Sequence, residues 1–175
     1  MGQEVQKDEG IWISEDVFSL ACGALPLVSI DFVIVSKTGP KAKVLVGRRR
    51  NSPAKDFLFT PGGRIRKGEP VLQAMCRILR NELGFNELLL ENKFFLGVWD
   101  HFYTDSAFSE SISTHYVNLA YRIEIDGVDP AILPSDQHSE WLFVGLDDKE
   151  LMSQIHPYAR TYVELALSGA PDIQV

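Results

Sequence analysis

The stretch PGGRIRKGEPVLQAMCRILRNELGF, residues 61–85, joins a glycine-rich loop to a helix, and the rest of the chain is organised around it. Its two consecutive glycines carry no β-carbon, so a bound group can come close to the main chain of the loop. Pro70 suits the first helical turn, where its missing amide proton costs nothing, and Gly84 is typical of the left-handed residue that ends a helix. The sequence therefore predicts a helix over residues 70–83, directly after a loop that can contact a ligand.

The predicted helix has two faces of different character. Apolar side chains recur at steps of four, three and four residues, which predicts a stripe that packs on a sheet. The members of this stripe are Leu72, Cys76, Leu79 and Leu83. Positions 78, 81 and 82 lie on another face, and Glu69 precedes Arg77 by eight residues. This spacing is close enough for an ion pair that braces the loop against the helix.

The whole stretch resembles the Nudix box, G-x5-E-x7-R-E-U-x-E-E-x-G-U, in which U is a large apolar residue. The matching residues are Gly63, Glu69, Arg77, Leu79, Glu82, Gly84 and Phe85. Ile78 and Asn81 stand where the family has two of its glutamates. In the family these carboxylates gather one to several Mg²⁺ ions, which prefer hard oxygen ligands and substrate phosphates. With Glu82 alone, the resemblance implies a site that holds fewer metal ions and lacks a base on the box.

Loss of these two glutamates resembles the GDP-mannose mannosyl hydrolase branch of the Nudix superfamily, and the likeness covers about residues 25–165. Supporting stretches are PLVSIDF at 26–32, VGRRRNSPA at 46–54, FTPGGR at 59–64, GVWDHFY at 97–103, THYV at 114–117 and LPSDQH at 133–138. The resemblance implies an α/β protein with the Nudix fold, an α/β/α sandwich around a mixed sheet. It also implies hydrolysis of a GDP-hexose, GDP-mannose or GDP-glucose, to GDP and free sugar by C–O cleavage at the anomeric carbon.

By resemblance, Glu82, the carbonyl of Gly63 and the side chain of Gln137 hold Mg²⁺, with Mn²⁺ as an alternative ion. Waters and phosphate oxygens would complete the metal shell. His138, beside Gln137 in the loop PSDQHSEW, matches the family's general base. Without the resemblance, a lone glutamate and a loop histidine are ordinary surface residues. The resemblance therefore carries both assignments.

The substrate contacts are also implied by resemblance. Asp31 and His101 would face the sugar, and Arg49 and Tyr116 the diphosphate. Arg64, directly after the glycines, would also face the diphosphate, and its planar fork suits phosphate oxygens. Together with Arg49 it is expected to act catalytically, by neutralising charge that grows on the departing GDP. A plainer interpretation makes Asp31 a polar residue at a strand edge and His101 an alternating strand residue.

Composition and charge limit the size of the domain and the kinds of partner that it can bind. The chain has 175 residues, of which 45% are hydrophobic, and this is the size of one domain with its own core. We expect a flexible tail over residues 1–10 and a single Nudix hydrolase domain over residues 11–175. The net charge of −7 argues against a general nucleic-acid surface, because phosphate backbones need a broad basic face. A basic cluster nevertheless flanks the glycine loop and suits a small polyphosphate. Its members are Arg48, Arg49, Arg50, Arg64, Arg66 and Lys67.

Two cysteines, Cys22 and Cys76, lack metal-ligand spacing and are expected to be reduced core thiols. No apolar run is long enough for a membrane span, and the polar start MGQEVQKDEG does not resemble a signal peptide. These features predict a cytoplasmic protein without membrane or nucleic-acid partners. The resemblance adds a homodimer whose small-molecule partner is a nucleotide sugar.

The remaining elements follow from caps, periodicity and turn residues. We expect helices that start at Ser14 and cover 158–167, and strands over 27–35, 43–49, 58–60, 93–103, 115–125 and 141–144. The first two strands should form a hairpin. Residues 104–114, TDSAFSESIST, are polar and form either a lid over a ligand or an ordinary hairpin loop.

Two other functions stay open at this point. An ordinary Nudix pyrophosphatase would act on a nucleotide sugar or another nucleoside diphosphate derivative and release a nucleoside monophosphate, although that chemistry usually relies on the fuller metal cluster. A Nudix-like sensing module would bind a nucleotide sugar tightly with little turnover. The products formed separate these alternatives.

Overall fold

The computed structural model describes residues 13–85 and 87–168, so the tail expected over residues 1–10 lies outside the described residues. The elements in chain order are α1 Glu15–Ala24, β1 Leu27–Ser36, β2 Lys43–Arg49, β3 Leu58–Phe59, β4 Gly62–Arg64, α2 Val71–Leu83, η1 Glu87–Asn92, β5 Lys93–Tyr103, β6 Thr114–Glu124, η2 Pro130–Ile132, β7 His138–Val144, α3 Lys149–Gln154 and α4 Pro157–Ser168. Of these, the sequence does not predict β4, because glycines are depleted in strands, or the short helix α3.

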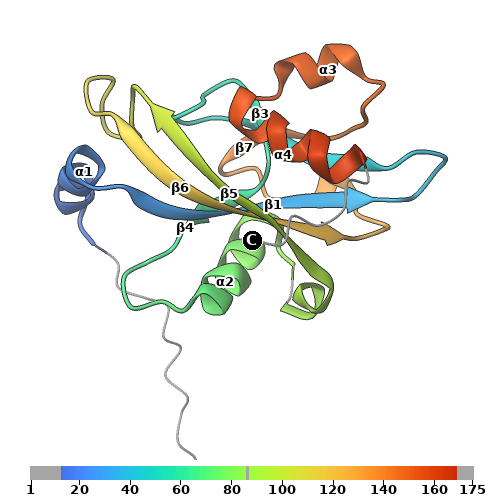
Figure 1. Ribbon diagram of the computed structural model, residues 1–175, viewed down its shortest axis with the longest axis horizontal. Helices are drawn as coiled ribbons and strands as arrows, with labels where there is room; N and C mark the ends of the chain where they lie inside the picture. The colour runs from blue at the N-terminus through green and yellow to red at the C-terminus, as the bar shows by residue number, and fades with distance from the viewer. Residues whose placement is uncertain (1–12, 86, 169–175) are drawn as a thin grey trace, which may run out of the picture.

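The described residues form a seven-stranded mixed sheet (Figure 1). Its main path is β3-β2-β1-β6-β5, with β4 paired to β1 and β7 paired to β2. The pair β1–β6 is parallel, from Leu27 opposite Tyr116 to Val35 opposite Glu124, and the other pairs are antiparallel. β1 lies at the centre and is buried on both faces, which explains its nearly continuous apolar run. The hairpin of β1 and β2 is confirmed by their antiparallel register.

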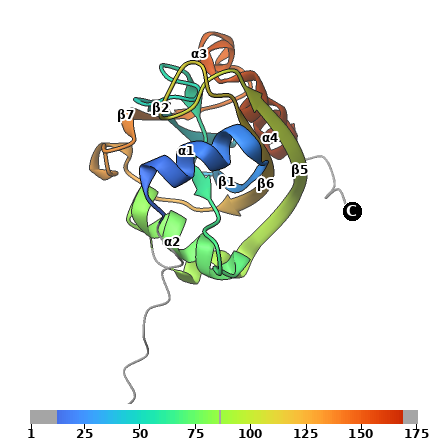
Figure 2. The ribbon, with the colours of Figure 1, turned by 90° about the vertical axis from the view of Figure 1, so that its left-hand side faces the viewer.

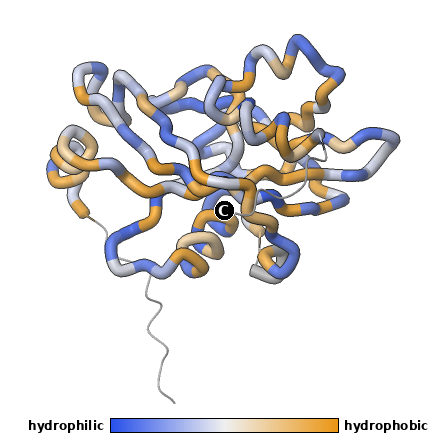
Figure 3. The backbone as a smooth tube through the Cα atoms, viewed as in Figure 1, coloured by the Kyte–Doolittle hydropathy of each residue, from blue (hydrophilic) through white to orange (hydrophobic). Residues whose placement is uncertain are grey.

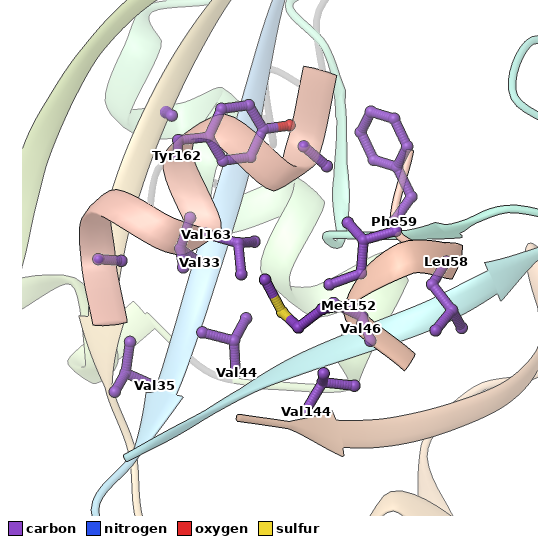
Figure 4. Close-up of a cluster of buried hydrophobic side chains, with 14 of the residues drawn as sticks. Val33, Val35, Val44, Val46, Leu58, Phe59, Val144, Met152, Tyr162 and Val163 are labelled. Atoms are coloured by element: carbon purple, nitrogen blue, oxygen red, sulfur yellow. The ribbon is translucent and has the colours of Figure 1, made fainter. Parts of the chain in front are cut away.

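Helices cover both faces of this sheet, as the resemblance implies. α2 lies on one face, and α4 with α3 lies on the other (Figure 1). Under α4, Tyr162 and Val163 pack on valines of β1 and β2, among them Val33 and Val46 (Figure 4). A second cluster on the α2 side includes Ile30 of β1. Figure 3 shows hydrophobic segments concentrated at the middle of the molecule, between the layers. The fold is the predicted α/β/α sandwich with a mixed sheet.

The central helix α2 begins one residue later than predicted, and its buried face matches the predicted stripe at Leu79 and Leu83 but not at its start. Pro70 has an extended backbone and caps the helix from outside, whereas Gly84 ends it at φ 69°, as predicted. Leu72 is 56% exposed, so its place in the predicted stripe is wrong. Ile78 is only 2% exposed and packs with Met75 in the core. The buried face therefore also includes Met75 and Ile78. Its exact position depends on how α2 docks on the sheet, and the spacing of apolar residues in the sequence does not record this docking.

The first helix lies across one end of the sheet. Ser14 caps α1 as predicted, since its side chain accepts a hydrogen bond from the Val17 amide. Figure 2 looks onto this end, with α1 in front of β1 and β6. Residues 104–113 connect β5 to β6 as a hairpin, and Phe108 of this loop packs edge-to-face on Phe18 of α1, with ring centroids 5.1 Å apart. The loop and α1 therefore form one wall at this end of the molecule. Neither cysteine in the described residues forms a disulfide.

Candidate active site

A cleft of about 1020 Å³ opens beside α1, between the sheet, the 104–113 loop and the loop that follows β2. The structure brings together along this cleft all but one of the residues that the sequence nominates. These are Asp31, Arg49, Gly63, Arg64, Glu82, His101, Tyr116 and Gln137. They come from β1, β2, β4, α2, β5, β6 and the loop before β7. The exception is His138.

The predicted ion pair braces the glycine loop against α2. Arg77 Nε donates to Glu69 Oε1 over 2.6 Å, and Arg77 Nη2 donates to Glu69 Oε2 over 2.8 Å and to the Arg64 carbonyl over 2.9 Å. The Arg66 amide donates to Glu69 Oε2 as well. Burial alone would raise the pKa of Glu69, but these hydrogen bonds hold that pKa below its usual value. The spacing of eight residues therefore predicts a real contact that fixes the loop carrying Arg64.

Glu82 lies near the end of α2 with its side chain 15% exposed in the cleft. Burial raises the pKa of its carboxyl to about 7; Arg49 opposes the rise, and the charges of Asp31 and Asp136 add to it. The Glu82 carboxylate, the main chain of Gly63 and the Gln137 amide line the same cleft and form an oxygen-rich donor set. Such a set fits a hard divalent cation, which would favour the ionised form of Glu82 and leave positions for phosphate oxygens. Within residues 13–85 and 87–168, no three acidic, histidine or cysteine side chains gather at metal-binding distance.

Asp31 is the second carboxyl group of the cleft and is buried in β1. Its Oδ2 accepts a short hydrogen bond from the Tyr162 hydroxyl. Its Oδ1 lies against Gly62, where a β-carbon would stand only 2.2 Å from that oxygen, so residue 62 has to be glycine. Burial raises the pKa of Asp31 to about 6, although hydrogen bonds from Tyr162 and Asn118 and the charge of Arg49 oppose this rise.

Only part of the predicted basic cluster faces the cleft. Arg49, Arg50 and Arg64 line it, together with Lys55, which is not a member of the predicted cluster. Arg64 lies over the Phe18 ring at 4.1 Å, a cation–π contact that orients its guanidinium. Arg48 instead pairs with Glu140 and Gln154 of the surrounding surface. Arg66 and Lys67 also lie outside the residues that line the cleft. The positively charged part of the cleft therefore contains fewer residues of the basic cluster than the sequence suggests.

His138 lies behind Glu82 rather than on the cleft wall. The ring is 2% exposed, packs on Trp141 at 4.2 Å and fits under Gly47, where a β-carbon would stand 2.5 Å from it. Its Nδ1 is 3.7 Å from Glu82 Oε2, and neither ring nitrogen has a hydrogen-bond partner among the described residues. Burial, together with the charge of Arg49, lowers the pKa of His138 to about 3. The imidazole is therefore neutral at neutral pH, and its role as base stays a prediction.

His101 and Tyr116 face the cleft from neighbouring strands. The His101 ring is stacked on Tyr158 at 4.7 Å, and its buried Nε2 lacks a hydrogen-bond partner in the part of the chain that the structure describes. Burial, and then the neighbouring His156, lower the pKa of His101 to about 4. Burial raises the pKa of Tyr116 to about 12, so both groups are neutral at neutral pH. Both side chains can therefore hydrogen-bond to a ligand without adding charge to the cleft.

The cleft is also lined by residues that are not predicted from the sequence. Strand alternation would have found two of them, because Tyr103 follows His101 by two residues and Asn118 follows Tyr116 by two. Phe18 and Phe108 meet only through the docking of α1 on the 104–113 loop, for which no local signal exists.

Comparison with known proteins identifies the family. The family model described as NUDIX domain matches residues 28–165. The low-salt glycan biosynthesis protein Agl8 of Haloferax volcanii is 32% identical over 152 residues, which cover 87% of this chain and 89% of that protein. The chain therefore belongs to the Nudix family and is a Nudix hydrolase by fold and sequence.

Solved structures share this fold. The NUDIX domain of Shewanella oneidensis NrtR, complexed with ADP ribose, superposes with a TM-score of 0.61 at 17% identity, over 88% of this chain and 97% of that chain. The MutT NUDIX hydrolase from Burkholderia pseudomallei gives a TM-score of 0.57 at 26% identity, over 79% and 96% of the two chains. The E. coli dihydroneopterin triphosphate pyrophosphohydrolase gives 0.62 at 18% identity, over 82% and 96%. In the described part of this chain, no helix has the length and apolar character needed to cross a membrane.

Proposed function

We propose that this Nudix protein hydrolyses a GDP-hexose, GDP-mannose or GDP-glucose, to GDP and free sugar by water attack at the anomeric carbon. The observation that carries the proposal is the composition of α2, in which Glu82 is the sole acidic residue. Ile78, at a position of a family glutamate, is buried in the core. The helix therefore supplies one carboxylate where cleavage at phosphorus usually relies on several. Cleavage of the C–O bond requires less charge stabilisation from the metal, because only the charge of the departing diphosphate has to be stabilised.

Each residue of the cleft has a distinct part in this proposal. Glu82, the Gly63 carbonyl and Gln137 would hold Mg²⁺ or Mn²⁺, which when bound neutralises charge on the diphosphate. Arg49 and Arg64 carry positive charge into the same cleft and would stabilise the leaving GDP.

The sugar would occupy the same cleft. Asp31 and His101 are buried polar groups that line it, and Tyr116 offers a neutral hydroxyl toward the diphosphate. The proposed base is His138, whose neutral imidazole can accept a proton from water.

The relatives support a nucleotide-sugar substrate. Agl8 of Haloferax volcanii bears a name from glycan biosynthesis, a process that consumes activated sugars. The NrtR domain was crystallised with ADP ribose, in which a diphosphate joins a nucleoside to a sugar.

We further propose that the protein works in the cytoplasm as a homodimer. Sedimentation velocity of the purified protein measures the oligomeric state, and a monomer would contradict the proposed homodimer.

Product analysis tests the proposal. The purified protein is incubated with GDP-mannose and Mg²⁺ in H₂¹⁸O, and ³¹P NMR and mass spectrometry follow the products. GDP without sugar phosphate, and ¹⁸O in the sugar, are expected. GMP with mannose 1-phosphate, and ¹⁸O in a phosphate, would instead assign the protein to the pyrophosphatases. Tight binding without turnover would favour a sensing module.

His138→Gln tests the base. Its kcat is expected to fall by about 10²–10⁴, the usual loss on removal of a general base, with little change in GDP affinity. His115→Gln is the matched control, because His115 pairs with Asp100 and lies outside the residues that line the cleft. Equal kcat values for both variants and the wild type would assign the proton transfer to another group.

A further inference from the structure

Tyr162 is buried beneath the cleft without lining it. The residue belongs to α4, its side chain is fully buried, and its ring packs with the valines of β1 and β2 (Figure 4). A tyrosine at such a position carries a hydroxyl group into an apolar core, which is unfavourable unless the hydroxyl finds a partner. The partner is the carboxylate of Asp31, which does line the cleft. One side chain of α4 thus reaches through the core to the site.

The direction of the hydrogen bonds follows from the number of protons. Tyr162 has a single hydroxyl proton, and an ionised Asp31 carboxylate can only accept, so Tyr162 donates to Asp31 Oδ2. The Tyr162 oxygen also lies 3.4 Å from Thr60 Oγ1, and with its own proton committed it can only accept from Thr60. Thr60, Tyr162 and Asp31 therefore form a directional chain. The other carboxylate oxygen occupies the space that a β-carbon at residue 62 would take, so the hydrogen bond from Tyr162 is made on the opposite oxygen of Asp31.

The Tyr162 ring also contacts a second residue of the site. It lies parallel to the His101 ring within 19°, with centroids 6.1 Å apart, and is held from another direction by Trp99 at 5.3 Å. Asp31 and His101 are the two residues proposed to contact the sugar, and Tyr162 touches both. No comparable contact to Glu82 or Arg64 is found for Tyr162 among the described residues.

We infer that Tyr162 is a positioning residue, which fixes the Asp31 carboxylate and the His101 ring for the sugar part of the substrate. The inference rests on the proposed function, because it assigns these two groups to the sugar. Its consequence is a selective defect: loss of the Tyr162 hydroxyl should impair the reaction at the sugar and leave recognition of the nucleotide intact.

The test compares Tyr162→Phe with Tyr158→Phe. Both changes remove one phenolic hydroxyl from α4 and keep a ring that lies against His101, but the Tyr158 hydroxyl hydrogen-bonds to the amide and carbonyl of Phe102 in β5 rather than to Asp31, so Tyr158→Phe should keep the kcat of the wild type. For Tyr162→Phe, kcat with GDP-mannose is expected to fall by about ten- to a hundredfold, the range that corresponds to a lost hydrogen bond to a charged group. The inhibition constant of GDP, which lacks the sugar, should stay within about twofold of the wild type. Equal losses of kcat and of GDP affinity would indicate a general structural effect and overturn the inference.

A double-mutant cycle tests whether Tyr162 acts through Asp31. In the Asp31→Asn background, Tyr162→Phe should change kcat by less than about twofold, because the charge that the hydroxyl serves is gone. Additive losses in the double variant would overturn the inference. GDP binding verifies that each variant is folded, and if Tyr162→Phe does not fold, Thr60→Val removes the donor behind Tyr162 and enters the same cycle. If the wild type releases GMP and sugar phosphate, the proposed function is wrong. The double-mutant cycle is then measured on that reaction, so failure of the proposed function and failure of this inference remain distinguishable.

Discussion

Replacing Asp31 with asparagine is expected to stabilise the folded protein above neutral pH while it impairs turnover. Asp31 is buried, and burial raises the pKa of its carboxyl from 3.8 to about 6. The folded state therefore holds this proton more tightly than the unfolded chain does. Stability is lost as the pH rises through the window between about 4 and about 6, because the charged form is favoured in the unfolded chain. Asparagine keeps the shape of the side chain but carries no charge.

The magnitude follows from the size of the shift. A rise from 3.8 to about 6 corresponds to about 3 kcal/mol of stability lost once Asp31 is ionised in both states. At pH 8 we therefore expect Asp31→Asn to be more stable than the wild type by about 2–3 kcal/mol, and its Tm to be higher by about 4–12 °C. Near pH 4 the difference should shrink below about 1 kcal/mol, because the folded wild type is then protonated at this site.

Urea unfolding followed by circular dichroism at pH 4 and pH 8 measures both differences. Glu164→Gln is the matched control, because Glu164 is exposed on α4 and lies outside the residues that line the cleft. It should change stability similarly at both pH values. A wild type that is as stable as Asp31→Asn at pH 8 would refute the reasoning, since the buried charge would then be fully compensated by its hydrogen bonds.

Three further predictions concern the box. Mg²⁺ at about a hundred times its Kd should stabilise the wild type by about 2.7 kcal/mol at pH 8 but leave Glu82→Gln nearly unchanged, and equal shifts in thermal unfolding would place the ion elsewhere. Ile78→Ala should cost about 2–5 kcal/mol in urea unfolding and Leu72→Ala less than about 1, because only the first side chain is buried; the reverse order would contradict the docking of α2. Arg77→Ala should cost about 1–3 kcal/mol by leaving Glu69 without its main partner, and an unchanged unfolding midpoint would argue against the brace.

Much of the fold could be predicted because its signals are local. The apolar run of β1, the Ser14 cap and the glycine that ends α2 each act within a few residues. The ion pair of Glu69 and Arg77 is also local, since it joins a loop to the helix that follows it. Such features depend on short-range geometry, which spacing in the sequence records directly.

The position of His138 could not be predicted, because it depends on the packing of distant segments. The sequence places this residue beside Gln137, and a loop exposed to the cleft is the natural expectation. In the structure β7 starts at His138 and pairs with β2, with a shift of register between Gly47 and Arg49. The missing β-carbon of Gly47 leaves room for the imidazole ring beneath β2. The same pairing that brings Gln137 to the cleft therefore turns its neighbour inward.

The two glutamates of the box show how the surroundings of a buried carboxylate separate support from ligand binding. Glu69 has hydrogen bonds from Arg77 and from the Arg66 amide, and its pKa is lowered. Glu82 has no such set of donors among the described residues, and burial raises its pKa to about 7. The first carboxylate is compensated by the protein itself, as a brace between loop and helix requires. The second is compensated only in part, by the charge of Arg49, and destabilises the fold when it is ionised, which is typical of a functional site. A single helix thus has a structural glutamate before its start and a candidate ligand near its end, and their opposite pKa shifts distinguish the two roles.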